Sequence, residues 1–104
     1  MDPMNLNLNE HILCFRVYGR VQGVFYRATC KDIAKKLNLR GYVKNLDDGS
    51  VEIGCYGTKE DVDKLIEWAK IGPKNARVER LEFVNIDSKR ISYIKSFNDF
   101  VITG

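Results

Sequence analysis

The sequence contains few of the residues on which metal sites, disulfide scaffolds and catalytic triads depend. Its 104 residues include one histidine, His11, and three widely separated cysteines, Cys14, Cys30 and Cys55, with no C-x-x-C pair. A sparse, odd set of cysteines indicates reduced thiols in packing roles. One histidine is too few for a histidine-rich metal cluster, and the G-x-S-x-G motif of serine hydrolases is absent. We therefore expect no metal site.

The chain also lacks a long apolar run, a basic leader and a strong charge imbalance. No stretch approaches the roughly 18 apolar residues of a membrane span. Residues 1–10 hold neither a basic residue nor the apolar block of a secretory signal. The formal net charge of +3, from 17 Lys and Arg against 14 Asp and Glu, suits a small anionic ligand better than a nucleic acid. We expect a cytoplasmic protein with no membrane or nucleic-acid partner.

Patterning divides the chain into a tail and one domain. Residues 1–10 are polar and Asn-rich, which predicts a flexible tail, and residues 11–104 are predicted to form a single domain. Apolar alternation predicts strands over residues 12–18, 42–46, 50–56, 77–86 and 97–102. Apolar residues at helical spacing predict helices over residues 26–38 and 58–71. Residues 88–92 are predicted to be a polar connection.

This order of elements predicts the fold class. A strand, helix, strand, strand, helix and strand, followed by one extra C-terminal strand, give the α+β ferredoxin-like plan, an antiparallel sheet with two helices on one face. The Asp-Gly pair at Asp48 and Gly49 predicts a hairpin between the second and third strands. Thr58 is predicted to cap the second helix. The expected buried faces of the two helices are Ala28, Ile33, Ala34 and Leu37 for the first, and Val62, Leu65, Ile66 and Ala69 for the second.

The segment from Gly19 to Arg27, GRVQGVFYR, joins the first strand to the first helix. A glycine-bracketed turn at a helix N-terminus leaves backbone N–H groups unpaired, and these donors form an anion site together with the positive end of the helix dipole. Gly19 and Gly23 permit close approach of the backbone. The Walker A pattern is absent, which disfavours a nucleoside triphosphatase.

Arg27 stands in the first turn of the predicted helix, where a cation faces the unfavourable end of the dipole. A phosphate held between the loop amides and the guanidinium would remove this conflict. The alternative is that Arg27 lies over the surface or pairs with a carboxylate, and the spacing does not decide between the two. Asn45 ends the second strand beside a turn, where asparagine commonly caps local amides. Its amide would also suit a water molecule, as both donor and acceptor.

These segments resemble the acylphosphatase family. The resemblance rests on GRVQGVFYR, on GYVKNLDDGSVEI and on GPKNARVERLEF, and it extends from His11 to the C-terminus. It implies a ferredoxin-like acylphosphatase that hydrolyses acyl phosphates without metal or cofactor. One departure is Tyr42, where many relatives carry tryptophan, and this change bears on packing.

The resemblance also implies site residues. The family's catalytic arginine and asparagine fall on Arg27 and Asn45, and Asn45 would orient the attacking water. The phosphate-binding backbone amides fall on Arg20, Val21, Gln22, Gly23, Val24, Phe25, Tyr26 and Arg27. The implied partners are a small acyl phosphate as substrate and inorganic phosphate or a similar oxyanion as product and inhibitor. We expect a monomer.

Two other classes of function stay open. A ferredoxin-like sheet can stack single-stranded RNA on aromatic side chains, and Tyr18 and Tyr56 would provide such a platform, with Lys89, Arg90 and Lys95 along the phosphates. Against this reading, the aromatic RNP1 pattern is absent and Glu52 would share the face of Tyr56. The third possibility is a phosphate-binding regulatory domain without turnover, or an acylphosphatase-like part of a larger enzyme.

Overall fold

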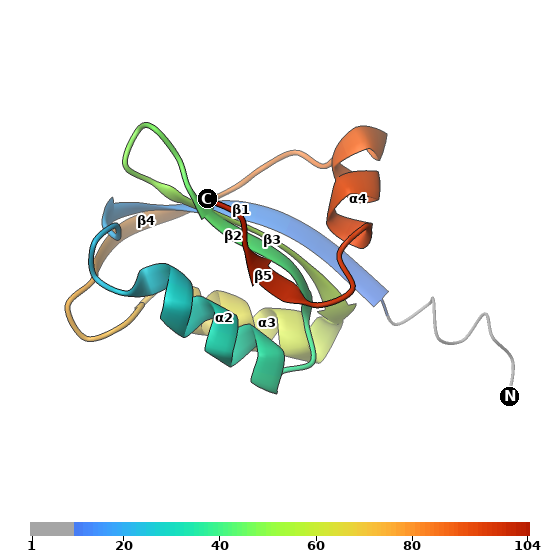
Figure 1. Cartoon of the computed structure of the whole chain (residues 1–104), viewed down its shortest axis with the longest axis horizontal. Helices are drawn as coiled ribbons and strands as arrows, with labels where there is room; N and C mark the ends of the chain where they lie inside the picture. The colour runs from blue at the N-terminus through green and yellow to red at the C-terminus, as the bar shows by residue number, and fades with distance from the viewer. Residues whose placement is uncertain (1–9) are drawn as a thin grey trace, which may run out of the picture.

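The computed structural model describes residues 10–104, which form one five-stranded sheet with helices on both faces (Figure 1). The elements are β1 (Glu10–Arg20), α2 (Tyr26–Lys36), β2 (Arg40–Asn45), β3 (Val51–Thr58), α3 (Lys59–Ala69), β4 (Arg77–Phe83), α4 (Ser88–Lys95) and β5 (Phe100–Ile102). The predicted tail lies outside the described residues except for Glu10, which begins β1. Within the described part, no helix is long and apolar enough to cross a membrane.

The strand order in the sheet is β4-β1-β3-β2-β5. The pairs β1–β3, β1–β4 and β2–β3 are antiparallel, which agrees with the ferredoxin-like prediction. The prediction of a wholly antiparallel sheet is wrong at one edge, because β5 pairs with β2 in parallel. The chain leaves β4 at one edge of the sheet and crosses, by way of α4, the face that is opposite α2 and α3. It then enters β5 at the other edge in the direction of β2, so the sheet is mixed.

Helices α2 and α3 cover one face of the sheet, as predicted (Figure 1). The four residues expected to be buried on α3 are all buried. Thr58 caps α3 by accepting a hydrogen bond from the backbone N–H of Asp61 at 3.2 Å. The sheet residues beneath these helices are fully buried and include Phe15, Val17, Val43, Val51 and Ile53. Each such side chain stabilises the fold by about 1.5–3 kcal/mol relative to exposure.

The buried face of α2 differs from the prediction in part. Ala34 is buried and Ile33 and Leu37 pack half-buried against the core, as predicted, but the other buried residues are Tyr26 and Cys30, and Ala28 is exposed. Tyr26 sets the rotation of the helix, because its hydroxyl donates a hydrogen bond to the carbonyl of Ala69 at 2.8 Å. Residues four positions apart then follow it inward. Ala28 consequently faces away from the core.

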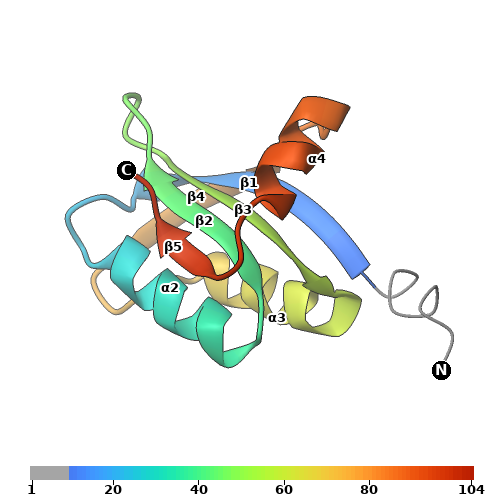
Figure 2. The same cartoon turned by 45° about the vertical axis from the view of Figure 1, so that its right-hand side comes forward.

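Helix α4 is the element that the sequence analysis missed. It occupies the stretch predicted as a polar connection, and it lies on the face of the sheet opposite α2 and α3 (Figure 2). Asp87 caps it, accepting from the backbone N–H of Arg90 at 2.8 Å, and Ile94 is its one fully buried residue. Because only one residue of α4 is fully buried, its sequence shows only a weak helical repeat of apolar residues. The final strand is correspondingly shorter than predicted and begins at Phe100.

Beneath α4, three cationic side chains surround the carboxylate of Glu52. It accepts a hydrogen bond from Arg16 at 2.9 Å and one from the Tyr42 hydroxyl at 2.8 Å. Arg90 lies 3.4 Å away and Lys44 lies 3.8 Å away. Burial alone would raise the pKa of Glu52, but these partners outweigh it and hold the pKa below its ordinary value. The cluster joins β2 and β3 to α4 on the face of the sheet opposite α2 and α3.

Replacing Glu52→Gln should therefore destabilise the protein in a pH-dependent way. We expect a loss of about 2 kcal/mol in the free energy of unfolding at pH 7, because hydrogen bonds to a charged group are lost. A depressed carboxyl pKa contributes stability above the unfolded pKa that is lost as pH falls through the folded pKa. The difference between variant and wild type should thus shrink below about pH 4. Urea denaturation at pH 7 and pH 3 measures it.

The matched control is Glu60→Gln, on the exposed surface of α3, where Glu60 lies 3.4 Å from Lys64. Exposed pairs contribute little, so this change should stay within about 0.5 kcal/mol at both pH values. Equal losses in the two variants would contradict the role of the buried carboxylate.

Candidate active site

Three segments distant in sequence meet at one end of the sheet. The loop from β1 to α2, the turn between β2 and β3, and the C-terminus gather there in both views, whereas β1 begins at the other end (Figures 1 and 2). A cavity of about 350 Å³ lies at this end. Its lining residues are Val21, Gly23, Phe25, Arg27, Ala28, Asn45 and Ile102. The structure therefore brings the two predicted site residues, Arg27 and Asn45, to one cavity.

Positive backbone φ angles shape the loop between β1 and α2. Gly19 has a φ of 127°, and a Cβ there would lie 2.1 Å from the carbonyl oxygen of Arg77. The close approach that glycine permits at this position is thus to β4 and not to a ligand. Further along, Gly23 has a φ of 75° and Phe25 a φ of 64°. These left-handed residues turn the chain sharply into α2.

The N-terminus of α2 presents unpaired donors. Its N-cap residue is Phe25, which has no side-chain oxygen to bind the first amides, and its first turn contains no acidic residue. Among the hydrogen bonds of residues 10–104, the backbone N–H groups of residues 22–28 donate to no protein acceptor. Such donors, with the positive end of the helix dipole, form an anion-binding site. The structure thus leaves the amides of residues 22–27 of the predicted set without a protein acceptor, whereas Arg20 belongs to β1 and pairs with Arg77 of β4; the binding of an anion by these amides stays a prediction.

Arg27 lies in the first turn of α2 and is partly exposed. Its guanidinium donates a hydrogen bond to the main-chain oxygen of Gly104. In the described part of the chain it forms no ion pair with an Asp or Glu side chain. No Asp or Glu side chain of the described residues is therefore the carboxylate weighed as an alternative partner, and the partner observed for the guanidinium is the main-chain oxygen of Gly104, the last residue of the sequence.

Asn45 is the last residue of β2, and its backbone N–H donates to the same Gly104 oxygen at 3.0 Å. Its side-chain Oδ1 is buried and has no hydrogen-bond partner among the described residues. An unsatisfied buried acceptor costs about 1–3 kcal/mol. Asn45 therefore does not cap the neighbouring turn through this oxygen.

Gln22 has a role that the sequence analysis missed. It was expected to contribute a backbone amide, but its side-chain Nε2 also donates to the carbonyls of Leu46 and Ser50, each at 2.9 Å. These carbonyls flank the turn that follows Asn45. A long amide side chain between two glycines was the available signal, although the sequence did not identify its partners. Gln22 ties the loop to the strand that carries Asn45.

The three cysteines are all buried and free, which agrees with packing roles. Burial raises the pKa of the Cys55 thiol to about 12 and raises that of Cys30. Burial also raises the pKa of Cys14, which lies on the other face of the sheet beneath α4. A thiolate is the reactive form of cysteine. None of the three thiols is therefore suited to act as a nucleophile near neutral pH.

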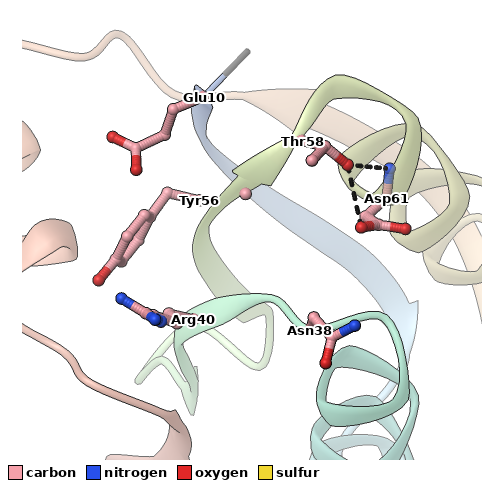
Figure 3. A pocket seen from close by; sticks show the side chains of 7 residues that line it. Glu10, Asn38, Arg40, Tyr56, Thr58 and Asp61 are labelled. Atoms are coloured by element: carbon pink, nitrogen blue, oxygen red, sulfur yellow. Dashed lines mark hydrogen bonds between the residues drawn. The ribbon is translucent and has the colours of Figure 1, made fainter. Parts of the chain in front are cut away.

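A second cavity of about 350 Å³ lies at the opposite end of the sheet (Figure 3). Its charged groups are Glu10, Arg40 and Asp61, and the side chain of Arg40 extends toward the ring of Tyr56. Asp61 is bound by Thr58 at 2.9 Å, and Glu10 pairs with Lys95 at 3.1 Å. Two carboxylates beside one guanidinium do not suit a phosphate.

The aromatic platform required for RNA stacking is not formed. Tyr56 is 6% exposed, and its hydroxyl donates to the carbonyl of Phe97 at 2.6 Å. Tyr18 is covered by Arg80, whose guanidinium carbon lies 3.9 Å from the ring centroid. Glu52 does share the face of Tyr56, but that face is buried beneath α4. The RNA-binding alternative therefore lacks the exposed aromatic surface on which RNA bases would stack.

Comparison with known proteins assigns the family. The acylphosphatase family model matches residues 13–102. The chain belongs to the acylphosphatase family. A protein of Pyrobaculum calidifontis named acylphosphatase is 48% identical over 87 residues, which are 83% of this chain and 74% of that protein. One of Pyrobaculum islandicum, also named acylphosphatase, is 42% identical over 97 residues, 92% of this chain and 94% of that protein.

The fold agrees with this assignment. The crystal structure of acylphosphatase from Bacillus subtilis superposes with a TM-score of 0.78 at 31% identity, covering 89% of this chain and 98% of that one. The ferredoxin-like fold and the family resemblance are thus confirmed, and the relatives support an acylphosphatase enzyme. The roles of Arg27, Asn45 and the loop amides are not tested by these comparisons and stay predictions.

Gln22→Ala should loosen the loop of this acylphosphatase-family chain. Loss of both side-chain bonds is expected to cost about 1–2 kcal/mol of stability. Because these bonds hold the loop, the backbone NMR order parameters of residues 23–25 should fall more than those in the core of β3. Relaxation measurements on the labelled protein test this. Asn85→Ala, on the exposed stretch after β4, is the control, and an equal fall at residues 23–25 in both variants would refute the role of Gln22.

Proposed function

We propose that this chain hydrolyses the carboxyl–phosphate bond of acyl phosphates to a carboxylate and inorganic phosphate, without a metal or cofactor. The observation that carries the proposal is the buried Oδ1 of Asn45, which has no partner and belongs to a residue lining the same cavity as Arg27. The free amides at the start of α2 border that cavity through Gly23, Phe25 and Arg27. One anionic group and one water molecule would satisfy all of these polar groups.

The phosphoryl group is bound by the backbone N–H groups of Arg20 to Arg27 and by the Arg27 guanidinium. The unpaired amides nearest α2 already lie at the positive end of its dipole, so binding there requires little reorganisation, whereas the amide of Arg20 lies at the end of β1. The guanidinium has several N–H donors. One N–H bonds to the carbonyl of Gly104, which fixes its position, and the others are available for phosphate oxygens in a bidentate arrangement.

Asn45 positions the nucleophile. Its Oδ1 accepts a hydrogen bond from a water molecule and thereby aims the water oxygen at phosphorus, in line with the bond to the acyl oxygen. The water forms a new O–P bond, the acyl O–P bond breaks, and the acyl group leaves as a carboxylate. The proton of the water passes to a phosphate oxygen, since no histidine lines the cavity.

This division of roles suits the chemistry of phosphoryl transfer. The reaction depends on positioning and on stabilisation of charge at the phosphoryl oxygens more than on covalent catalysis. A carboxylate is a good leaving group and needs no strong acid. We propose that the product, inorganic phosphate, binds in the same cradle and inhibits. We also propose that a monomer is active, because every residue of the site comes from one chain.

Arg27→Ala should abolish both binding and turnover. Without the guanidinium, the phosphoryl group keeps only the backbone amides, and we expect kcat/KM to fall by at least about 10³-fold. Phosphate inhibition should weaken in parallel. Hydrolysis of benzoyl phosphate, followed by its absorbance, and the inhibition constant of phosphate are the measurements. Lys31→Ala, one turn further along α2, is the control, and near wild-type turnover by Arg27→Ala would overturn the assignment.

Asn45→Ala should lower turnover and leave the affinity for phosphate almost unchanged. The variant loses the acceptor that orients water, so we expect kcat to fall by about 10²–10³-fold. The phosphate cradle is retained, so the inhibition constant of phosphate should change by less than about threefold, within about 0.7 kcal/mol. Parallel losses in kcat and in phosphate affinity would contradict a water-orienting role. Phosphate binding by the wild type without any turnover would instead favour a phosphate-binding regulatory domain.

A further inference from the structure

The candidate active site has an apolar side that phosphate binding does not use. Two large hydrophobic side chains line the cavity together with Arg27 and Asn45, namely Phe25 at the start of α2 and Ile102 at the end of β5. Phe25 is 80% exposed and Ile102 is 41% exposed. We call this pair of side chains the apolar wall. It borders the cavity from two different elements of the fold.

Phe25 is unfavourable in two respects. An exposed phenyl group gives up most of the stabilisation that burial would provide. Its φ of 64° is also an outlier for a bulky residue, and N-cap positions favour Ser, Thr, Asn or Asp. Strain and exposure that persist at a cavity mark a functional role more often than a structural one.

Other exposed hydrophobic residues do not combine these features. Phe83 packs its ring against Phe15 with centroids 6.2 Å apart, and Tyr93 packs against Tyr42 at 5.2 Å. Ile71, beyond the end of α3, is 74% exposed but does not line this cavity. The apolar wall is thus associated with the site and is not a general property of the surface.

The charge of the cavity lining restricts the kinds of acyl group that the site suits. Among its described lining residues, Arg27 alone is charged, and the proposed function commits its guanidinium to phosphate. A second anionic group on the acyl chain would find no cation of its own there. A neutral, apolar acyl group would instead bury its surface against Phe25 and Ile102. An aromatic acyl group would also stack on the phenyl ring.

We propose that the apolar wall binds the acyl group, so that the enzyme prefers acyl phosphates with aromatic or branched aliphatic acyl groups over small or anionic ones. This inference rests on the proposed function, because it assumes that the phosphoryl group occupies the cradle of loop amides. Phe25 and Ile102 are then specificity-determining residues, and the exposed phenyl group is covered when substrate binds.

The test is the ratio of kcat/KM for benzoyl phosphate to that for acetyl phosphate. Both substrates carry the same phosphoryl group, so damage to the cradle lowers both rates and cancels in the ratio. Phe25→Asn suits a left-handed backbone and removes the apolar ring. We expect it to lower the wild-type ratio by about tenfold, as hydrophobic pockets discriminate by about 10–200-fold. Ile102→Thr should lower it by about threefold to fivefold, since the ethyl branch of the side chain is replaced by a hydroxyl.

Ile71→Ala is the control for removing an exposed hydrophobic side chain away from the cavity, and its ratio should equal that of the wild type. An unchanged ratio in both Phe25→Asn and Ile102→Thr would overturn the apolar wall while leaving the proposed function intact. Failure of the wild type to hydrolyse either compound would overturn the proposed function itself.

Binding provides a measurement that does not depend on turnover. Phenylphosphonate and methylphosphonate share a phosphonate group and differ in their apolar part. We expect the wild type to bind phenylphosphonate about tenfold more tightly, with shifts of the Ile102 methyl resonances that methylphosphonate does not cause. Phe25→Asn should remove most of this preference. Equal affinities of the wild type for the two phosphonates would contradict the apolar wall.

Discussion

The side chain of Gln22 joins the two halves of the site, and the geometry of the rest depends on it. The loop amides and Arg27 belong to the connection between β1 and α2, whereas Asn45 belongs to β2. Gln22 crosses this gap with two hydrogen bonds of 2.9 Å to the carbonyls that flank the β2–β3 turn. The carbonyl of Gly104 makes a second bridge, because it accepts from both Arg27 and the backbone of Asn45. The two parts of the site are thus held together by main-chain oxygens that lie next to the ends of β2, β3 and β5.

Much of the fold was predictable because its signals are local. The Asp48-Gly49 turn, the Thr58 cap and the apolar stripe of α3 each follow from a few neighbouring residues, and each was confirmed. Helix α4 was missed because its burial rests on the single residue Ile94, which is too little for a clear period. The exposed side of α2 was misjudged because its rotation depends on the hydroxyl of Tyr26 reaching Ala69 on another helix. Parallel pairing of β5 likewise depends on a crossover that no local pattern encodes.

The candidate site shows the same division between local and distant causes. An arginine in the first turn of a helix and a loop bracketed by glycines are visible in the sequence, and they identified Arg27 and the amides. The shared cavity with Asn45 was reached through the family resemblance, since 18 positions separate the two residues in the chain. The side-chain bonds of Gln22 and the apolar exposure of Phe25 required coordinates. Neither follows from spacing, because each depends on where β2, β3 and β5 end.

Neighbouring residues of β2 show how the fold supports an unsatisfied site. Alternation along the strand directs Lys44 and Asn45 to opposite faces of the sheet. On the α4 face, Lys44 joins a carboxylate whose polar partners are complete, and this cluster holds β2 in place. On the α2 face, the oxygen of Asn45 is left without a partner at a cost in stability. A buried polar group that is rigidly held and unpaired is poised to bind a ligand, because the group gains its missing hydrogen bond without reorganising the chain. The satisfied α4 face of β2 thus holds in place the unpaired Asn45 side chain for which we propose a catalytic role.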